Sequence, residues 1–199
     1  LAIPVDPDTT WQDHPNAWRL QRSELAVLRA LMAWREREAV RRDVPRGHLL
    51  TPLSVFELAR RPPKNVFGLS DIPELNPRVA RRDGEQLLAL IAAARELPEA
   101  EQPLRQPPPL PREAGSVYDA LKQALQAVVA SSGVPLEVLW RKRLADRVVL
   151  AAVDQGLPAA DTMLTGWRAP LLQATVASVL QQHQDSLRAW GEQRRQAVT

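Results

Sequence analysis

The 199-residue sequence predicts an all-α fold of two small helical bundles joined by a proline-rich linker. Apolar residues recur at spacings of three and four, which is the pattern of a helix with one buried face. Capping side chains followed by proline mark two helix starts, at Thr51-Pro52 and at Asn76-Pro77. No stretch of useful length alternates apolar and polar residues, so no β-strand is predicted.

The first bundle is expected at residues 20–97, after a connecting segment at residues 1–19. Its first helix should begin near Gln21 and end at Arg42, because Asp43-Val44-Pro45 follows. The apolar stripe of this helix consists of Leu25, Leu28, Leu31 and Met32.

Two further helices and a turn complete the first bundle. The second helix should begin at Thr51-Pro52 and end before Pro62-Pro63. Asn65 is expected to cap a short turn, and Asn76-Pro77 to begin the third helix. Gly84 lies inside this third helix, where glycine costs about 1 kcal/mol relative to alanine. It therefore predicts either close helix packing or a short break. The residues expected to face inward are Val79, Leu87, Leu88 and Ile91.

Residues 98–114 contain six prolines, which exclude a continuous helix and favour an extended spacer. We interpret this stretch as a linker between domains rather than as an SH3 ligand. The second bundle is expected at residues 115–187, followed by a basic tail at 188–199. Ser116 should cap its first helix and Ser132-Gly133 should end that helix. Its apolar faces comprise Tyr118, Leu121, Leu125, Val128, Leu136, Leu139, Trp140, Leu144, Leu172, Val176, Val179 and Leu180.

Composition indicates a cytoplasmic protein. The sequence contains no cysteine, which excludes disulfides and thiolate metal sites and fits a reducing compartment. The longest apolar run, at residues 87–94, is too short to span a bilayer, and the N-terminal residues lack the features of a signal peptide. Because the sequence begins with Leu1 rather than methionine, we expect it to be part of a longer protein.

The formal net charge of +3 is distributed unevenly. Residues 20–97 contain fourteen Lys/Arg and ten Asp/Glu, whereas residues 115–187 contain six of each. The excess is mostly arginine, whose planar guanidinium suits phosphate better than the lysine ammonium does. This distribution is consistent with a nucleic-acid partner for the first bundle.

Catalytic and metal-binding patterns are not recognisable in the sequence. His14, His48 and His183 are scattered and have no second ligand at a metal-binding spacing. Asp6 and Asp8 form an Asp-x-Asp pair, but no predicted strand supports it, so a solvated turn is the better interpretation. We therefore expect neither a catalytic residue nor a metal or cofactor site in this chain.

Basic residues at helix ends are the candidate nucleic-acid contacts. Cations are disfavoured at a helix N-terminus, so Arg78, Arg81 and Arg82 stand out in the first turns of the third helix. The alternative is that Glu74 and Asp83 neutralise them. The full set of candidates in the first bundle is Arg41, Arg42, Arg60, Arg61, Lys64, Arg78, Arg81 and Arg82.

The second bundle contains a smaller basic set, with a solvated helix face as the equal alternative. The secondary candidates, which lie near the further basic residue Arg147, are Arg141, Lys142, Arg143 and Arg168. Trp34, Trp140 and Trp167 lie on or beside apolar stripes, so we expect core positions for them rather than base-stacking positions.

Several segments resemble the helicase and ribonuclease D C-terminal (HRDC) domain. In the first bundle they are residues 28–39 (LRALMAWREREA), 42–46 (RDVPR), 58–62 (LARRP) and 82–88 (RDGEQLL). The second bundle resembles the divergent second HRDC domain of ribonuclease D, through residues 137–139 with the basic run after them and residues 164–168 (LTGWR). Two such domains in tandem are more similar to ribonuclease D than to RecQ-type helicases.

This resemblance implies a parent protein that is a metal-dependent 3′→5′ exoribonuclease trimming tRNA precursors. The family's active site, four carboxylates and a tyrosine, belongs to a separate N-terminal domain, and the divalent metal is implied for that domain only. Tyr118-Asp119 does not supply the tyrosine motif, so no catalytic residue carries over. The implied partners are RNA, with tRNA precursors as the expected substrates, and the nuclease domain of the same parent, with no membrane. A protein-interaction module and a RecQ-type helicase fragment remain the alternatives.

Overall fold

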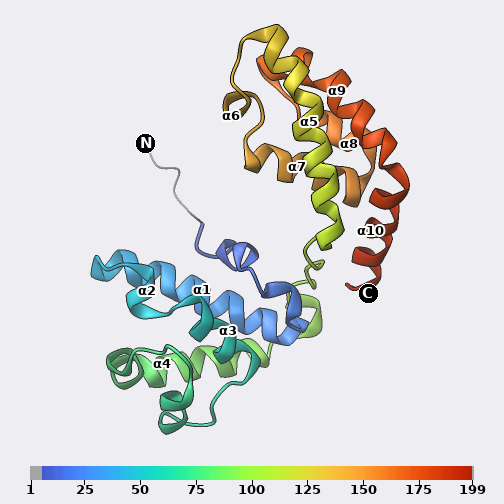
Figure 1. Ribbon diagram of the computed structural model, residues 1–199. Helices are drawn as coiled ribbons and strands as arrows, with labels where there is room; N and C mark the ends of the chain where they lie inside the picture. The colour runs from blue at the N-terminus through green and yellow to red at the C-terminus, as the bar shows by residue number, and fades with distance from the viewer. Residues whose placement is uncertain (1–5, 199) are drawn as a thin grey trace. The chain divides into compact units, whose positions relative to one another are not determined.

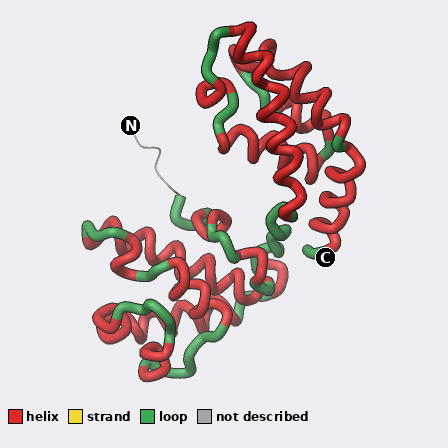
Figure 2. Tube along the Cα trace, viewed as in Figure 1, coloured by secondary structure: helices red, strands yellow, loops and turns green. Residues whose placement is uncertain are grey.

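The computed structural model describes residues 6–198, and in this range all regular secondary structure is helical (Figure 2). The all-α prediction is therefore confirmed. The chain divides into two compact units, of which unit 1 ends at Gln106 and unit 2 begins at Pro107. Residues 1–5 of the expected connecting segment and residue 199 of the expected tail lie outside the described range.

Unit 1 is built around α1, a helix of 21 residues that packs against α3 and α4 (Figure 1). Its α-helices are α1 (Arg22–Arg42), α2 (Arg46–Leu49), α3 (Pro52–Arg60) and α4 (Pro77–Arg95). Its 3₁₀ helices are η1 (Thr10–Asp13), η2 (Ala17–Arg19), η3 (Phe67–Asp71) and η4 (Glu99–Glu101).

The helix ends of unit 1 confirm the local signals in the sequence. The Thr51 hydroxyl oxygen accepts a hydrogen bond from the Ser54 N–H at 3.1 Å, which caps α3. The Asn76 side-chain oxygen accepts from the Arg78 N–H at 2.9 Å at the start of α4. At the end of α1, Asp43 adopts a left-handed conformation with φ 51°, which stops the helix.

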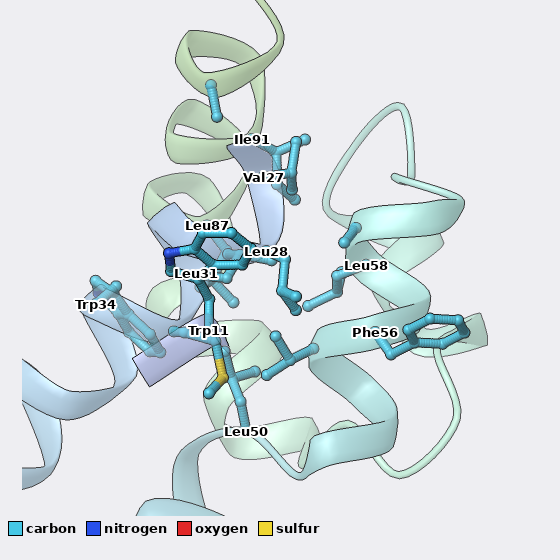
Figure 3. Close-up of a cluster of buried hydrophobic side chains, with 14 of the residues drawn as sticks. Trp11, Val27, Leu28, Leu31, Trp34, Leu50, Phe56, Leu58, Leu87 and Ile91 are labelled. Carbon is cyan, nitrogen blue, oxygen red and sulfur yellow. The ribbon is translucent and has the colours of Figure 1, made fainter. Parts of the chain in front are cut away.

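The core of unit 1 begins earlier in the chain than expected. Trp11, which precedes α1, is buried in the same cluster as Leu28 and Leu31 of that helix (Figure 3). Leu20 also precedes α1 and belongs to this cluster. The described part of the expected connecting segment therefore packs as part of unit 1.

Gly84 allows close packing between α4 and η3. A Cβ atom at this position would lie 2.7 Å from Leu69 Cδ1 and 3.2 Å from Val66 Cγ1. Leu69 is fully buried, so its side chain has little room to move. Of the two explanations offered by the sequence, close packing applies, because α4 continues unbroken through Gly84.

In its described residues, 107–198, unit 2 contains six α-helices, with α5 packed against α9 and with α7 packed against α8 and α10. The α-helices are α5 (Gly115–Ser132), α6 (Leu136–Leu139), α7 (Lys142–Gln155), α8 (Leu157–Thr162), α9 (Ala169–Gln182) and α10 (Gln184–Gln196). Its 3₁₀ helices are η5 (Arg112–Ala114) and η6 (Gly166–Arg168).

The prediction for α5 is confirmed at the end of the helix and wrong at its start. Gly133 ends the helix with φ 69°, as predicted. The prediction that Ser116 caps the start is wrong, because η5 runs directly into α5 and places Ser116 inside the first turn. There its hydroxyl donates to the Glu113 carbonyl oxygen at 2.7 Å.

Residues expected to form a basic tail belong instead to α10, which packs on α7. Arg194 binds Asp154 through two hydrogen bonds of 2.8 and 3.0 Å, and its side chain is only 8 % exposed. Gly191 permits this contact between helices, since a Cβ there would overlap the Val153 carbonyl oxygen.

The proline-rich stretch is divided between the two units. Arg22 of α1 donates to the carbonyl oxygens of Glu99, Gln102 and Pro103, at 2.5, 3.2 and 3.4 Å, and so fastens residues 99–103 to unit 1. In unit 2, Arg194 donates to the Pro108 carbonyl oxygen. The expected linker boundaries at 98 and 114 thus differ from the structural division, because each unit binds the nearer part of the linker.

Replacement of Gly84 by alanine should lower the free energy of unfolding of unit 1 by about 1–2 kcal/mol, because the overlap with buried Leu69 outweighs the gain in helix propensity. Denaturant unfolding followed by circular dichroism measures this change. Gly47→Ala in α2 is the control, since nothing lies within 4 Å of its added Cβ. Equal or greater stability of Gly84→Ala would contradict close packing.

Limited digestion with trypsin should cut first after Arg105, which lies between η4 and η5. The prolines that follow it exclude a helix, and a protease needs an extended backbone. Two protected helical fragments should remain, visible by mass spectrometry. Protection of one fragment that spans Arg105 would contradict the division into two units.

Candidate nucleic-acid interface

The predicted contacts of unit 1 all lie at helix ends. Arg60, Arg61 and Lys64 lie at or just after the end of α3, whereas Arg78, Arg81 and Arg82 lie in the first turns of α4. Arg41 and Arg42 are the last two residues of α1. The structure separates these residues into those that bind carboxylates and those that do not.

Arg42 is bound within the protein and joins α1 to α4. Its guanidinium donates to both carboxylate oxygens of Asp83, at 2.8 and 2.9 Å, and also lies 2.5 Å from a Glu38 oxygen. The side chains of Arg42 and Asp83 are 13 % and 5 % exposed. Such a bidentate pair is strong and directional, so the charge of Arg42 contributes mainly to packing.

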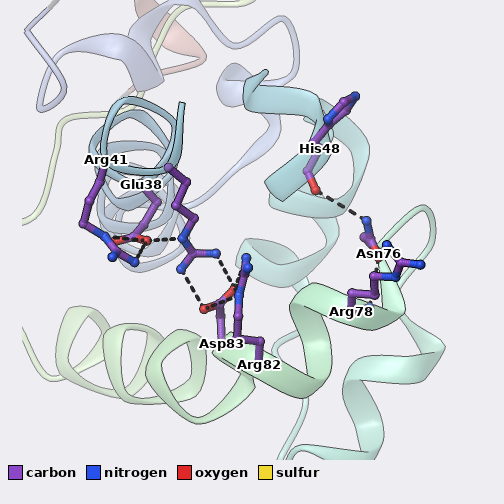
Figure 4. Close-up of polar contacts among 8 residues, drawn as sticks. Glu38, Arg41, His48, Asn76, Arg78, Arg82 and Asp83 are labelled. Carbon is purple, nitrogen blue, oxygen red and sulfur yellow. Dashed lines mark hydrogen bonds and ion pairs between the residues drawn. The ribbon is translucent and has the colours of Figure 1, made fainter. Parts of the chain in front are cut away.

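Arg41 and Arg82 bind the same two carboxylates from the solvent side. Arg41 donates to Glu38 at 2.9 Å, and Arg82 donates to Asp83 at 3.1 Å (Figure 4). The hydrogen bond from Arg41 is the main reason that the pKa of Glu38 lies below its ordinary value, and the charge of Arg42 adds to it. The alternative that Asp83 neutralises nearby arginines therefore applies to Arg82.

Five of the predicted contacts have exposed side chains that form no hydrogen bond or ion pair with any residue of the described range 6–198. They are Arg60, Arg61, Lys64, Arg78 and Arg81. Arg61 and Lys64 line one open pocket, of about 460 Å³, together with Glu57 and Asp71. These two carboxylates weaken the local positive potential. The arginines of α4 do not line this pocket.

Unit 2 gathers its arginines more tightly. A pocket of about 260 Å³ at the start of α7 is lined by Arg141, Arg143, Arg147 and Arg168, together with Leu144, Met163 and Thr165. None of these seven lining residues is acidic. Arg147 is not among the predicted contacts, although its spacing of four from Arg143 places both on one helix face. Lys142, a predicted contact, is exposed but does not line the pocket.

The tryptophans follow the prediction except at one position. Trp34 and Trp140 are buried, as expected. Trp167 is 50 % exposed, so its expected core position is wrong. It lies in η6 just after Gly166, whose φ of 62° turns the chain before α9 and takes Trp167 out of the apolar stripe. The guanidinium of Arg168 lies 4.4 Å from the centre of a Trp167 ring.

Residues 6–198 contain no group of three His, Asp or Glu side chains placed to hold a metal ion. His14 has a structural role. Its ring nitrogen lies 3.0 Å from the Pro52 carbonyl oxygen, and its ring stacks on Phe56 at 5.9 Å. Burial lowers the pKa of His14.

Within residues 6–198, no helix is long and apolar enough to cross a membrane.

Removal of the Asp83 carboxylate, as in Asp83→Ala, should lower the stability of unit 1 by about 3 kcal/mol, because it leaves the mostly buried Arg42 with only Glu38 as a partner. Denaturant unfolding measures this loss. Glu85→Ala is a matched control on the same helix, at an exposed position. If both variants were equally stable, the Arg42–Asp83 pair would not fix the packing of α1 against α4.

Comparisons with known proteins agree with this architecture. The HRDC domain family model matches residues 24–91. Ribonuclease D of Pseudomonas paraeruginosa is 36 % identical over 168 residues, covering 84 % of this chain and 45 % of that protein. Ribonuclease D of Gluconacetobacter diazotrophicus is 34 % identical over 176 residues, covering 84 % and 44 %.

A solved structure is similar over both units. The crystal structure of Escherichia coli RNase D, described as an exoribonuclease involved in structured RNA processing, has a TM-score of 0.77 and 27 % identity. The similarity covers 91 % of this chain and 48 % of that chain. The chain thus spans less than half the length of these relatives. Residues 24–91 are therefore an HRDC domain, and the chain corresponds to the C-terminal region of ribonuclease D.

Proposed function

We propose that this chain is the RNA-binding region of a ribonuclease D-type 3′→5′ exoribonuclease that acts in tRNA 3′ processing in the cytoplasm. In this proposal it holds RNA near a catalytic domain that is not part of the chain, and that domain supplies the divalent metal. The relatives and the HRDC domain support the family assignment. The RNA-binding role is supported by the basic surface of unit 1.

The single observation that carries this proposal is the set of exposed cations without an acidic partner in unit 1. Arg60, Arg61, Lys64, Arg78 and Arg81 form no described ion pair within residues 6–198. Arginine and lysine side chains of this kind contact phosphates and position a nucleic acid without selecting its sequence. Arg42, by contrast, is committed to Asp83, so we assign it to the fold and not to RNA.

Unit 2 is proposed as a second, divergent HRDC domain. It has two possible roles in the parent protein: it contacts RNA, or it packs on the nuclease domain. Its pocket of four arginines favours a contact with RNA.

A protein-interaction role for unit 1 is the second candidate function, and two exposed apolar side chains favour it. Val40 is 83 % exposed and Phe67 is 87 % exposed. Exposed apolar residues that occur singly are ordinary on protein surfaces, so this observation is the weaker of the two.

The substitutions Arg78→Ala and Arg81→Ala, made together, should flatten the dependence of the logarithm of RNA affinity on the logarithm of salt concentration. Each phosphate contact contributes a slope of about −0.7 for a single strand, so the loss of two contacts should reduce the slope by about 1.4. Helix α4 should persist, because alanine is the stronger helix former. Binding of the 199-residue chain to oligouridine at several salt concentrations measures the slope.

The matched control is Arg112→Ala with Lys122→Ala, which removes two exposed charges from η5 and α5. An equal slope for the test pair, the control pair and the unmodified chain would remove Arg78 and Arg81 from the RNA surface. If the unmodified chain bound no RNA at low salt, the protein-interaction role would replace the proposal.

A further inference from the structure

The pocket of unit 2 gathers basic side chains without acidic ones. Residues 115–187 contain six Lys/Arg, and four of them line this pocket. The same residues contain six Asp/Glu, but none of these lines the pocket. Asp154, for example, is bound by Arg194 on another part of α7. Unit 2 as a whole contains ten Lys/Arg and eight Asp/Glu, so the pocket is a local concentration of positive charge and not the result of a strongly basic surface.

The arginines of the pocket are placed against local helix preferences. Arg141 is the N-cap residue of α7, and Arg143 lies in its first turn, where the helix dipole repels cations. Arg143 and Arg147 are four residues apart, a spacing at which like charges destabilise a helix. Within residues 6–198, neither the Arg141 side chain nor the Arg143 side chain has a hydrogen-bond or ion-pair partner. A bound anion would relieve each of these repulsions.

Arg168 is already positioned and keeps donors available. Its Nε and one terminal nitrogen donate to the Val138 carbonyl oxygen, at 3.1 and 3.0 Å, which fixes the plane of the guanidinium. A guanidinium has five N–H groups, so others remain for a ligand. Thr165 adds a hydroxyl to the lining. Several arginines and a hydroxyl around a pocket of about 260 Å³ suit a phosphate group, whereas pockets for larger organic ligands begin at about 300 Å³.

Trp167 adds an aromatic surface beside this phosphate-sized pocket. Half of its surface is exposed, and its neighbour Arg168 both stacks on its ring and lines the pocket. Exposed aromatic rings next to basic grooves stack on the bases of single-stranded nucleic acids, without selecting the base. The bases of a duplex are paired and stacked on each other, so they are not available to Trp167.

We propose that this pocket binds one unpaired nucleotide of a single-stranded RNA segment, with its backbone phosphate among Arg141, Arg143, Arg147 and Arg168 and its base on Trp167. This inference rests on the proposed function, because RNA is the ligand in both. It adds a specific site in unit 2 and a preference for single strands. The residues of this site differ from those of the unit 1 surface, so each can be removed separately.

The test uses the complete 199-residue chain with oligouridine and a blunt RNA duplex as probes. Arg143→Ala with Arg147→Ala should flatten the salt slope on oligouridine by about 1.4. The control pair Arg112→Ala with Lys122→Ala, at exposed positions outside the pocket, should leave the slope unchanged. An equal slope for the pocket pair and the control pair would overturn the site.

Trp167→Leu separates stacking from charge. Loss of one stacked base should weaken oligouridine binding by about 5-fold to 150-fold, with an unchanged salt slope because no charge is removed. Binding to the duplex should not change. An equal loss on both probes, or no loss on oligouridine, would overturn the single-strand preference. Circular dichroism verifies that the variant remains folded, as expected for an exposed position in a short 3₁₀ helix.

The two proposals fail separately. If Arg78→Ala with Arg81→Ala flattens the slope and the pocket pair does not, the RNA-binding function stands and the unit 2 site is wrong. If only the pocket pair flattens the slope, the site stands and the RNA surface assigned to unit 1 is wrong. Absence of oligouridine binding by the unmodified chain at low salt would overturn both.

Discussion

A bidentate pair between a mostly buried arginine and a carboxylate holds helices together in each unit of this chain. In unit 1 the pair is Arg42 with Asp83, which joins α1 to α4. In unit 2 it is Arg194 with Asp154, which joins α10 to α7. Domains of this size bury a smaller fraction of their surface on folding than larger domains do, so apolar packing alone leaves the relative position of their helices weakly fixed. The directional geometry of the guanidinium supplies that missing constraint.

This use of arginine inside the fold changes how the basic residues of the chain are interpreted. A cluster of arginines in the sequence can contain residues that bind carboxylates inside the fold and residues that are exposed to solvent. Only the partners seen in the structure distinguish the two. Arg41 and Arg42 are adjacent, yet Arg42 is enclosed between two carboxylates while Arg41 is largely exposed. At the start of α7, by contrast, Arg141 and Arg143 have no such partner within residues 6–198.

Local features of the fold were predictable from the sequence, and features that depend on distant residues were not. The caps at Thr51 and Asn76 and the stop at Gly133 act within four residues of themselves, so residue type and order suffice. The helix α10 is polar by composition, and it packs on α7 through the bond between its Arg194 and Asp154, which lies 40 residues earlier in the chain. Trp167 has an apolar neighbourhood in the sequence, but the positive φ of Gly166 removes it from that stripe. The basic residues of the second bundle could be recognised in the sequence. That they line one pocket could not, because Arg168 of η6 lies next to the arginines at the start of α7 only in the folded unit.

The crowding of positive charge at the start of α7 also has a thermodynamic consequence. Four arginines surround one pocket with no carboxylate in its lining, and repulsion between like charges at this distance lowers the stability of the folded unit. An anion that binds there, and does not bind to the unfolded chain, stabilises the folded state. At concentrations above the dissociation constant, this stabilisation rises with the logarithm of the ratio of anion concentration to dissociation constant. The folding equilibrium of unit 2 is thereby linked to anion concentration and ionic strength, independently of the core that holds its helices together.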